Sequence, residues 1–179
     1  MEQLLNTIFQ DANNLFLENE IDNILNDVNE RNLCGRLVIY LNDKIRENNL
    51  TGYFVDPEYN RKQDGQVKTI LDDEFNIINI NCDIIVHSRG NNIPADNLIA
   101  IEMKKSNRPE EEKISDKKRL RALTKESYDD IWSNDGVTLP EHVCCYVLGY
   151  YIELNIKARQ CLIEIYKKGN KIDEWTQAF

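Results

Sequence analysis

Two apolar runs with charges at their ends, in the stretch NCDIIVHSRGNNIPADNLIAIEMKKSN (residues 81–107), decide the fold of this chain. The runs CDIIVHS and LIAIEMKK flank the polar segment RGNNIPADN, so we expect two strands joined by a loop. Both runs carry apolar residues at consecutive positions, which is typical of a sheet covered on both faces. Asp83 begins the first strand, and Glu102 and Lys104 lie near the end of the second. Strands with a purely structural role in the core do not need these charges.

Helices are predicted on both sides of this pair of strands. Apolar residues recur at three- and four-residue intervals from Leu4 to Phe16, which indicates an amphipathic helix. The same spacing predicts a second helix from about residue 21 or 26 to residue 46. Residues 109–127 have acids early, bases late and no internal Gly or Pro, so we expect a third helix whose charges match its dipole.

Three more segments have the pattern of strands. Residues 51–71 place two short apolar or aromatic runs on either side of Asp64 and Gly65, a dipeptide suited to a tight hairpin, and Pro57 puts the first run near a sheet edge. The runs VCCYVLGYYIEL (143–154) and QCLIEIYKKG (160–169) predict two further strands before a short tail. The expected order is helix, helix, four strands, helix, two strands. This order is typical of an α/β or α+β fold, with a mixed central sheet flanked by helices.

Bulk composition narrows the class of protein. A chain of 179 residues with 41% hydrophobic content is expected to fold as one domain, residues 1–179, in which residues 1–25 form an extra N-terminal helix. The five cysteines lack the spacing of zinc or redox motifs, so we expect reduced thiols in a cytoplasmic protein. A basic leader and a long uncharged apolar run are both missing from the sequence, so we expect neither export nor membrane binding.

Charge is distributed unevenly along the chain. The net charge of -9 argues against a protein that simply coats nucleic acid. Residues 1–30 contain seven acids and no Lys or Arg, whereas basic residues gather between Lys104 and Lys125. This asymmetry is compatible with one basic face on an acidic body.

The charges of the central stretch suit metal-assisted chemistry. Residues two apart in a strand share a face, so Glu102 and Lys104 are predicted on one face and Met103 on the other. If the two strands pair as a hairpin, Asp83 lies beside Glu102. Two carboxylates on rigid strands, with positions open for water and phosphate, suit Mg²⁺. The lysine would hold or deprotonate the attacking water, or stabilise charge on a scissile phosphate.

This pattern resembles the PD-(D/E)XK nuclease superfamily, which has the restriction-endonuclease-like fold. Glu102 follows Asp83 after nineteen positions and Lys104 follows two positions later. In element order the resemblance covers about residues 26–168. It implies cleavage of phosphodiester bonds, in DNA more often than in RNA, with Mg²⁺ or Mn²⁺ as cofactor. The family's proline before the aspartate is Cys82 here, a position that the family often varies.

The resemblance also implies roles for individual residues. Asp83, Glu102 and the main-chain carbonyl of Met103 would be metal ligands, and Lys104 would be the catalytic lysine. Many members complete the metal site with a glutamate on the preceding helix, which Glu30 matches.

The position of Glu30 on the predicted helix indicates that its side chain faces inward. It stands three and seven residues before Leu33 and Leu37, so it continues the buried stripe of that helix. A carboxylate aimed inward is costly unless it is paired or bound to a metal. The alternative for Glu30 is an ion pair with Arg31 or Arg36 at the start of the helix.

The segment DKKRLRALT resembles an Asp-x-x-Arg-Leu-x-x-Leu-Thr element that follows the motif in some small members. The matching residues are Asp116, Arg119, Leu120, Leu123 and Thr124. Basic side chains in and near this segment are predicted to hold the nucleic-acid backbone; they are Lys105, Lys117, Arg119 and Arg121. The alternative is an ordinary solvated face, because the acidic run 110–112 weakens a phosphate site.

Other polar and aromatic residues have plain structural interpretations. Glu-x-Lys pairs also occur as ordinary ion pairs on solvated sheets, so the motif depends on Asp83 and on the apolar strands around it. His87, His142 and the cysteines are expected to be structural. The tyrosines of the last strands are expected in the core or on a sheet face; they are Tyr146, Tyr150, Tyr151 and Tyr166.

Two functions of different class follow from the sequence. The first is a metal-dependent nuclease that acts on DNA in restriction, repair or defence against foreign DNA. The second is a catalytically inactive module on the same fold, which binds a protein partner through its acidic N-terminal helices. Sequence specificity would come from loops such as RGNNIPADN, from a homodimer or from a partner chain.

Overall fold

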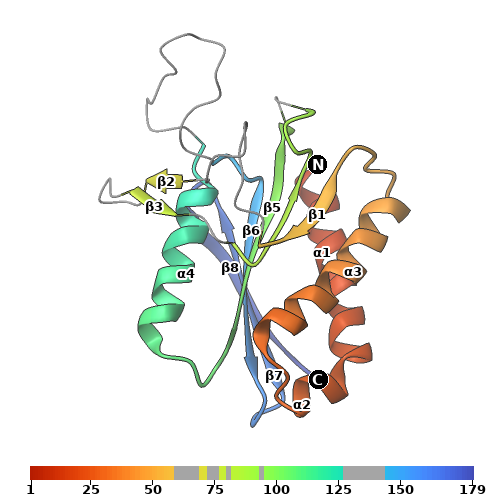
Figure 1. Ribbon diagram of the computed structural model, residues 1–179, viewed down its shortest axis with the longest axis vertical. Coiled ribbons are helices and arrows are strands. Elements are labelled where there is room, and N and C mark those ends of the chain that lie inside the picture. Colours follow the sequence, from red (N-terminus) through yellow and green to blue (C-terminus); the bar gives the residue numbers. More distant parts are fainter. Residues whose placement is uncertain (59–68, 72–76, 80–81, 93–94, 127–143) are drawn as a thin grey trace.

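A mixed six-stranded sheet with helices on both faces forms the body of the protein (Figure 1). The computed structural model describes residues 1–179 except 59–68, 72–76, 80–81, 93–94 and 127–143. Strand order in the sheet is β1-β4-β5-β6-β7-β8, and β2 and β3 form a separate two-stranded sheet. All pairs in the main sheet are antiparallel except β5 with β6, which is parallel. The expected α+β class is therefore confirmed.

The elements follow the chain in a simple order. They are α1 (Glu2–Asn19), α2 (Ile21–Leu25), α3 (Glu30–Glu47), β1 (Phe54–Pro57), β2 (Thr69–Leu71), β3 (Ile77–Asn79), β4 (Ile84–His87), β5 (Asn97–Lys105), α4 (Glu110–Leu123), β6 (Leu148–Asn155), β7 (Gln160–Lys167) and β8 (Asn170–Ala178). None of the described helices is both long and apolar enough to cross a membrane.

The two strands of the central stretch pair as predicted. β4 and β5 form an antiparallel pair in which Ile84 lies opposite Ile101. β1 pairs with the other side of β4 and is one of the two edge strands of the sheet, as Pro57 at its end indicated. The hairpin predicted at Asp64 and Gly65 lies outside the described residues.

The second predicted helix is divided in two. α2 ends at Leu25 and α3 begins only at Glu30, because Asp27 takes a left-handed backbone conformation (φ 57°) that a helix cannot continue. The side chain of Asn29 then caps α3 by accepting a hydrogen bond from the backbone N–H of Asn32 at 2.8 Å.

The predicted short tail is wrong, because residues 170–178 form the nine-residue strand β8. A hairpin joins it to β7 through Lys168 and Gly169, which both have positive φ (51° and 77°), the geometry that fits the twist of paired strands. The sequence NKIDEWTQA has few apolar residues because β8 is an exposed edge, so its hydrophobic pattern is weak. The strand predicted from residue 143 also begins later, at Leu148.

Each face of the sheet has its own core. α1 and α3 cover one face, where Phe9 stacks on Tyr150 with ring centroids 3.6 Å apart (Figure 1). α4 covers the other face, where Leu120 and Leu123 pack with Tyr151 and other buried residues of β4 to β7. The four tyrosines named from the sequence are buried, as expected. α4 therefore presents its C-terminal half to an apolar surface.

Close packing of α4 on β6 requires a glycine. A Cβ atom at Gly149 would lie 3.0 Å from Thr124 Cγ2 and 3.2 Å from Tyr166 Cβ. We expect Gly149→Val to lower the free energy of unfolding by about 1–3 kcal/mol, because overpacking a tight contact costs this much. Urea unfolding followed by circular dichroism measures the change.

A second glycine provides the control. A Cβ at Gly35, within α3, would meet no atom within 4 Å. Gly35→Ala should therefore raise the free energy of unfolding by about 0.5–1 kcal/mol through helix propensity alone. A Gly149→Val variant as stable as the wild type would contradict the close contact with α4.

Candidate active site

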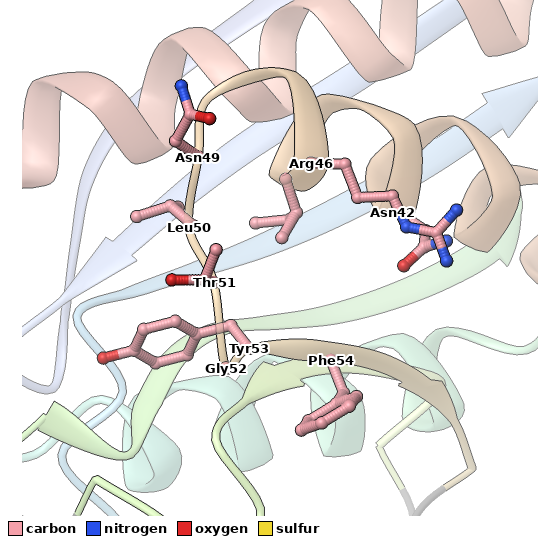
Figure 2. A pocket seen from close by; sticks show the side chains of 9 residues that line it. Asn42, Arg46, Asn49, Leu50, Thr51, Gly52, Tyr53 and Phe54 are labelled. Carbon is pink, nitrogen blue, oxygen red and sulfur yellow. The ribbon is translucent and has the colours of Figure 1, made fainter.

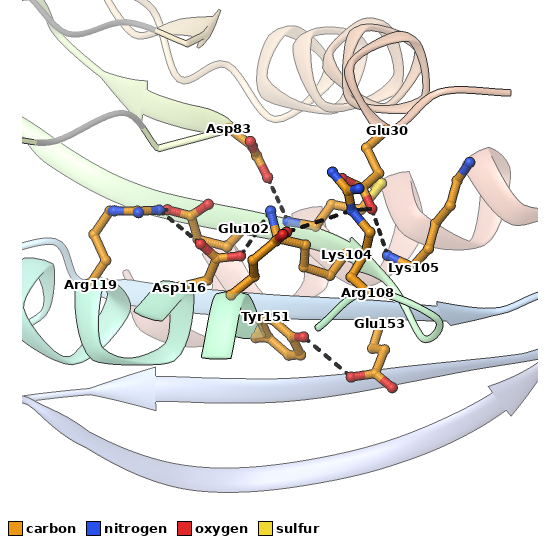
Figure 3. A network of polar contacts seen from close by, with 12 residues as sticks. Glu30, Asp83, Glu102, Lys104, Lys105, Arg108, Asp116, Arg119, Tyr151 and Glu153 are labelled. Carbon is orange, nitrogen blue, oxygen red and sulfur yellow. Dashed lines mark hydrogen bonds and ion pairs between the residues drawn. The ribbon is translucent and has the colours of Figure 1, made fainter. Parts of the chain in front are cut away.

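The start of β4 brings Asp83 to β5. Asp83 directly precedes β4, and its Oδ2 accepts a hydrogen bond of 2.8 Å from the backbone N–H of Met103 (Figure 3). The β4–β5 register places this aspartate beside Glu102, as the hairpin interpretation requires. Within the sheet this contact joins two residues that are twenty positions apart in the chain.

Alternation along β5 divides its charged end between two faces. Glu102 and Lys104 both contact α4, through Arg119 and Asp116 respectively. Met103 points to the opposite face, where its sulfur lies 4.0 Å from Cys34 of α3. The predicted sharing of one face by Glu102 and Lys104 is thus confirmed.

Glu102 is a buried acid held by an ion pair. It is only 1% exposed, and Arg119 Nη1 lies 2.5 Å from its Oε1 (Figure 3). Burial and the nearby charge of Asp83 raise the pKa of Glu102 well above its usual range, although Arg119 opposes this. Burial also raises the pKa of Asp83, against the hydrogen bond from Met103. Two acids are thus forced together in a poorly solvated site.

Lys104 is held by an acid from α4. Its Nζ lies 3.2 Å from Asp116 Oδ2, and its side chain is 15% exposed. Burial lowers the pKa of Lys104, but Asp116 and Asp83 together outweigh burial, so its net pKa lies above the usual value. Lys104 therefore carries a positive charge at neutral pH and can stabilise developing negative charge.

Asp116 is the site residue that sequence reasoning missed. It lies between the two cations, with Oδ1 3.1 Å from Arg119 and Oδ2 3.2 Å from Lys104 (Figure 3). The available signal was the Asp-x-x-Arg spacing, because residues three apart on a helix share a face. The segment DKKRLRALT therefore contributes an acid, Asp116, and a base, Arg119, to the site.

The balance of charge in this cluster fits a divalent cation. Two buried carboxylates, Glu102 and Asp116, and the half-buried Asp83 face two half-buried cations, Lys104 and Arg119. Hard oxygen donors with surplus negative charge are the donor set that Mg²⁺ and Mn²⁺ prefer. Among the residues that the structure describes, however, no three His, Cys, Asp or Glu side chains are already arranged around a common metal position. The charges suit a metal, and the side chains would have to move to bind it.

Glu30 reaches the end of β5 from the other side. As the first residue of α3, it accepts a hydrogen bond of 3.0 Å from the backbone N–H of Lys105 and lies 3.2 Å from Arg108 Nε. The expected alternative, a pair with Arg31 or Arg36, is wrong, because these arginines pair with Glu58 and Glu20. Arg108, brought close by tertiary folding, takes that place.

A cavity connects Glu30 with Asp83. Its volume is about 530 Å³, and both carboxylates line it together with Glu58 and Cys34. Another cavity of about 430 Å³ lies at the opposite end of α3, between Asn42 and Phe54 (Figure 2). None of the predicted site residues lines that second cavity. The first cavity therefore opens onto the candidate site at Glu30 and Asp83.

The four basic residues predicted to hold nucleic acid all have partners within the chain. Lys105 lies 2.6 Å from Asp27, and Lys117 lies 2.9 Å from Glu164. Arg121 lies over the ring of Tyr166, and Arg119 pairs with Glu102 as described above. Their binding to a nucleic-acid backbone stays a prediction.

His87 lies away from these charges, at the other end of β4. It is buried, and its Nε2 lies 2.9 Å from Asp56 Oδ2, which Arg89 also contacts. This arrangement fits the structural role expected for His87. His142 lies outside the described residues.

No family model matches the chain, and neither the curated proteins nor the solved structures contain a significant match to it.

Proposed function

We propose that this protein is a metal-dependent nuclease of the PD-(D/E)XK type that cleaves phosphodiester bonds in DNA. The observation that carries the proposal is the cluster of the buried Glu102 with the half-buried Asp83 and Lys104 at the ends of two paired strands. With Asp116 and Arg119, the cluster brings three acids and two bases together, and two of the acids are buried. Removing charged groups from water is expensive, and a purely structural sheet gains little from it. In a site that binds a cation and a phosphate, the acids would hold the cation and the lysine would stabilise the phosphate.

Each residue has a distinct part in the proposed reaction. Asp83, Glu102 and the carbonyl of Met103 would hold Mg²⁺ or Mn²⁺, with Glu30 in support from α3. The metal would supply a polarised phosphate and an activated water. Lys104, positively charged beside Asp116, would stabilise the charge that develops on the scissile phosphate.

A second candidate is an inactive module that binds a protein partner. The observation that favours it is the internal pairing of Lys105, Lys117, Arg119 and Arg121, which reduces the charge available to a phosphate backbone. Against it, two acids of the N-terminal helices are also paired inside the chain, Glu20 with Arg36 and Glu2 with Lys167. Metal binding discriminates between the two candidates.

Calorimetric titration of Mn²⁺ and then Mg²⁺ into the protein, with cleavage assays on plasmid and single-stranded DNA, tests the proposal. Metal binding with metal-dependent cutting would support the nuclease, and a protein that binds neither metal would be assigned to the second candidate.

Metal affinity should also depend on pH. Ordinary carboxyls lose their protons near pH 4. Because the pKa values of Asp83 and Glu102 are raised, both acids keep their protons to higher pH, and these protons must leave before a metal can bind. We therefore expect affinity to keep rising with pH above that range, and protons to be released on binding. Titrations in buffers of different ionisation enthalpy measure this release. An affinity that is flat above pH 5 would contradict the involvement of these two acids.

A further inference from the structure

The carboxylate of Glu102 already has a cation in the metal-free protein. Arg119 Nη1 lies 2.5 Å from Glu102 Oε1, and the two side chains are 18% and 1% exposed. The pair is therefore largely shielded from water, where charges interact more strongly than at a surface. A divalent cation cannot take this oxygen while the guanidinium stays on it, because the two positive charges would repel each other at close range.

Arg119 has a second acid within reach on its own helix. Its Nη1 also lies 3.1 Å from Asp116 Oδ1, so the guanidinium is shared between two carboxylates (Figure 3). Its Nε, in addition, is buried and has no hydrogen-bond partner among the described residues. Arg119 can therefore leave Glu102 without losing its counter-ion, and it retains a free donor for a new contact.

We propose that Arg119 is a displaceable counter-ion, which holds Glu102 in the metal-free protein and moves onto Asp116 when Mg²⁺ or Mn²⁺ binds. This inference rests on the proposed function.

Displacement would connect metal binding with the catalytic lysine. Asp116 contacts Arg119 through Oδ1 and Lys104 through Oδ2. A shift of Arg119 toward Asp116 therefore acts on the group that positions Lys104. Arg119 is in this sense a positioning residue that acts through Glu102 and Asp116.

Titration of Mn²⁺ into wild type and Arg119→Gln tests the displacement. Removing the internal competitor should tighten Mn²⁺ binding by about tenfold or more, and Mn²⁺ should raise the melting temperature of this variant more than that of the wild type. Lys117→Gln is the matched control, because it removes one positive charge from the same helix without touching Glu102. Its affinity should change much less than that of Arg119→Gln.

A second readout reports the movement itself. Side-chain nitrogen signals of Arg119, assigned by their loss in Arg119→Gln, should shift when diamagnetic Mg²⁺ is added to the wild type. If Arg119→Gln does not fold, Arg119→Lys replaces it, because this variant keeps the charge but loses the shared guanidinium contact. We then expect Arg119→Lys to bind Mn²⁺ more tightly than the wild type does.

The outcomes separate the two proposals. Metal binding to the wild type with unmoved Arg119 signals, and with equal affinities for Arg119→Gln and Lys117→Gln, would overturn the displacement alone. Absence of metal binding in every variant would overturn both the displacement and the proposed function.

Discussion

Replacing Lys104 by alanine is expected to reduce metal-dependent DNA cleavage by about a hundred- to a thousandfold, which is the usual cost of losing one group that stabilises the transition state. The fold should persist, because Asp116 keeps Arg119 as its partner when Lys104 is removed. Metal binding should also persist, since Lys104 is not a ligand. Single-turnover cleavage of plasmid DNA, with Mn²⁺ calorimetry on the same sample, measures both effects.

Lys113→Ala is the matched control for this variant. Lys113 is also a lysine whose ion pair joins α4 to the sheet; it is buried, with Nζ 3.3 Å from Glu153 of β6. Its loss should lower stability and leave cleavage near the wild-type rate. Full cleavage by Lys104→Ala would remove Lys104 from the mechanism.

Replacing Asp83 by asparagine should abolish metal binding without weakening the metal-free protein. Asparagine keeps an oxygen that can accept the hydrogen bond from Met103. The pKa of Asp83 is raised by burial, so the folded protein binds this proton more tightly than the unfolded chain does. Protonated Asp83 therefore stabilises the folded protein at acidic pH, and this contribution is lost as pH rises through the pKa of Asp83 in the folded state. At neutral pH the ionised carboxylate thus lowers the free energy of unfolding.

Thermal melting with and without Mn²⁺ measures both parts of this prediction. Wild type should gain about 2.7 kcal/mol at a metal concentration of roughly a hundred times Kd, and Asp83→Asn should gain almost none. Without metal, Asp83→Asn should be as stable as the wild type or slightly more so. A variant that still gains stability from Mn²⁺ would show that Asp83 is not a ligand.

Asp56→Asn is the control for loss of a half-buried, ion-paired acid. Asp56 of β1 pairs with His87 and Arg89, away from the acids that we propose as metal ligands. This variant should lose stability without metal and should keep the gain from Mn²⁺. The two aspartates are therefore expected to respond in opposite ways.

The sequence of α4 does not reveal which residues its buried charges pair with. The stripe that faces the sheet begins with Lys113, Asp116 and Lys117 and ends with Leu120 and Leu123. The apolar end packs as an amphipathic pattern predicts. The charged end is difficult to interpret from sequence, because such residues usually face solvent. The structure supplies their partners: Glu153 of β6 for Lys113, Glu164 of β7 for Lys117, and Lys104 of β5 for Asp116.

Local sequence determined the secondary structure of the central stretch and which charges share a face. Period-two alternation placed Glu102 and Lys104 together, and the loop between two apolar runs placed Asp83 beside them. These are short-range geometric consequences of a strand and a hairpin. β8 was not predicted, because its sequence has few apolar residues. The continuous helix predicted from the spacing is interrupted at Asp27, which takes a left-handed backbone conformation.

Tertiary structure alone decided which charge pairs with which. Glu30 pairs with Arg108, and Glu102 pairs with Arg119, although nearer bases were available to Glu30 in the sequence. The energy of an ion pair depends on distance and on shielding from water, and both are set only when helix and sheet come together. The sequence by itself therefore determined the candidate acids and the lysine, and the packing of α3 and α4 determined their counter-ions.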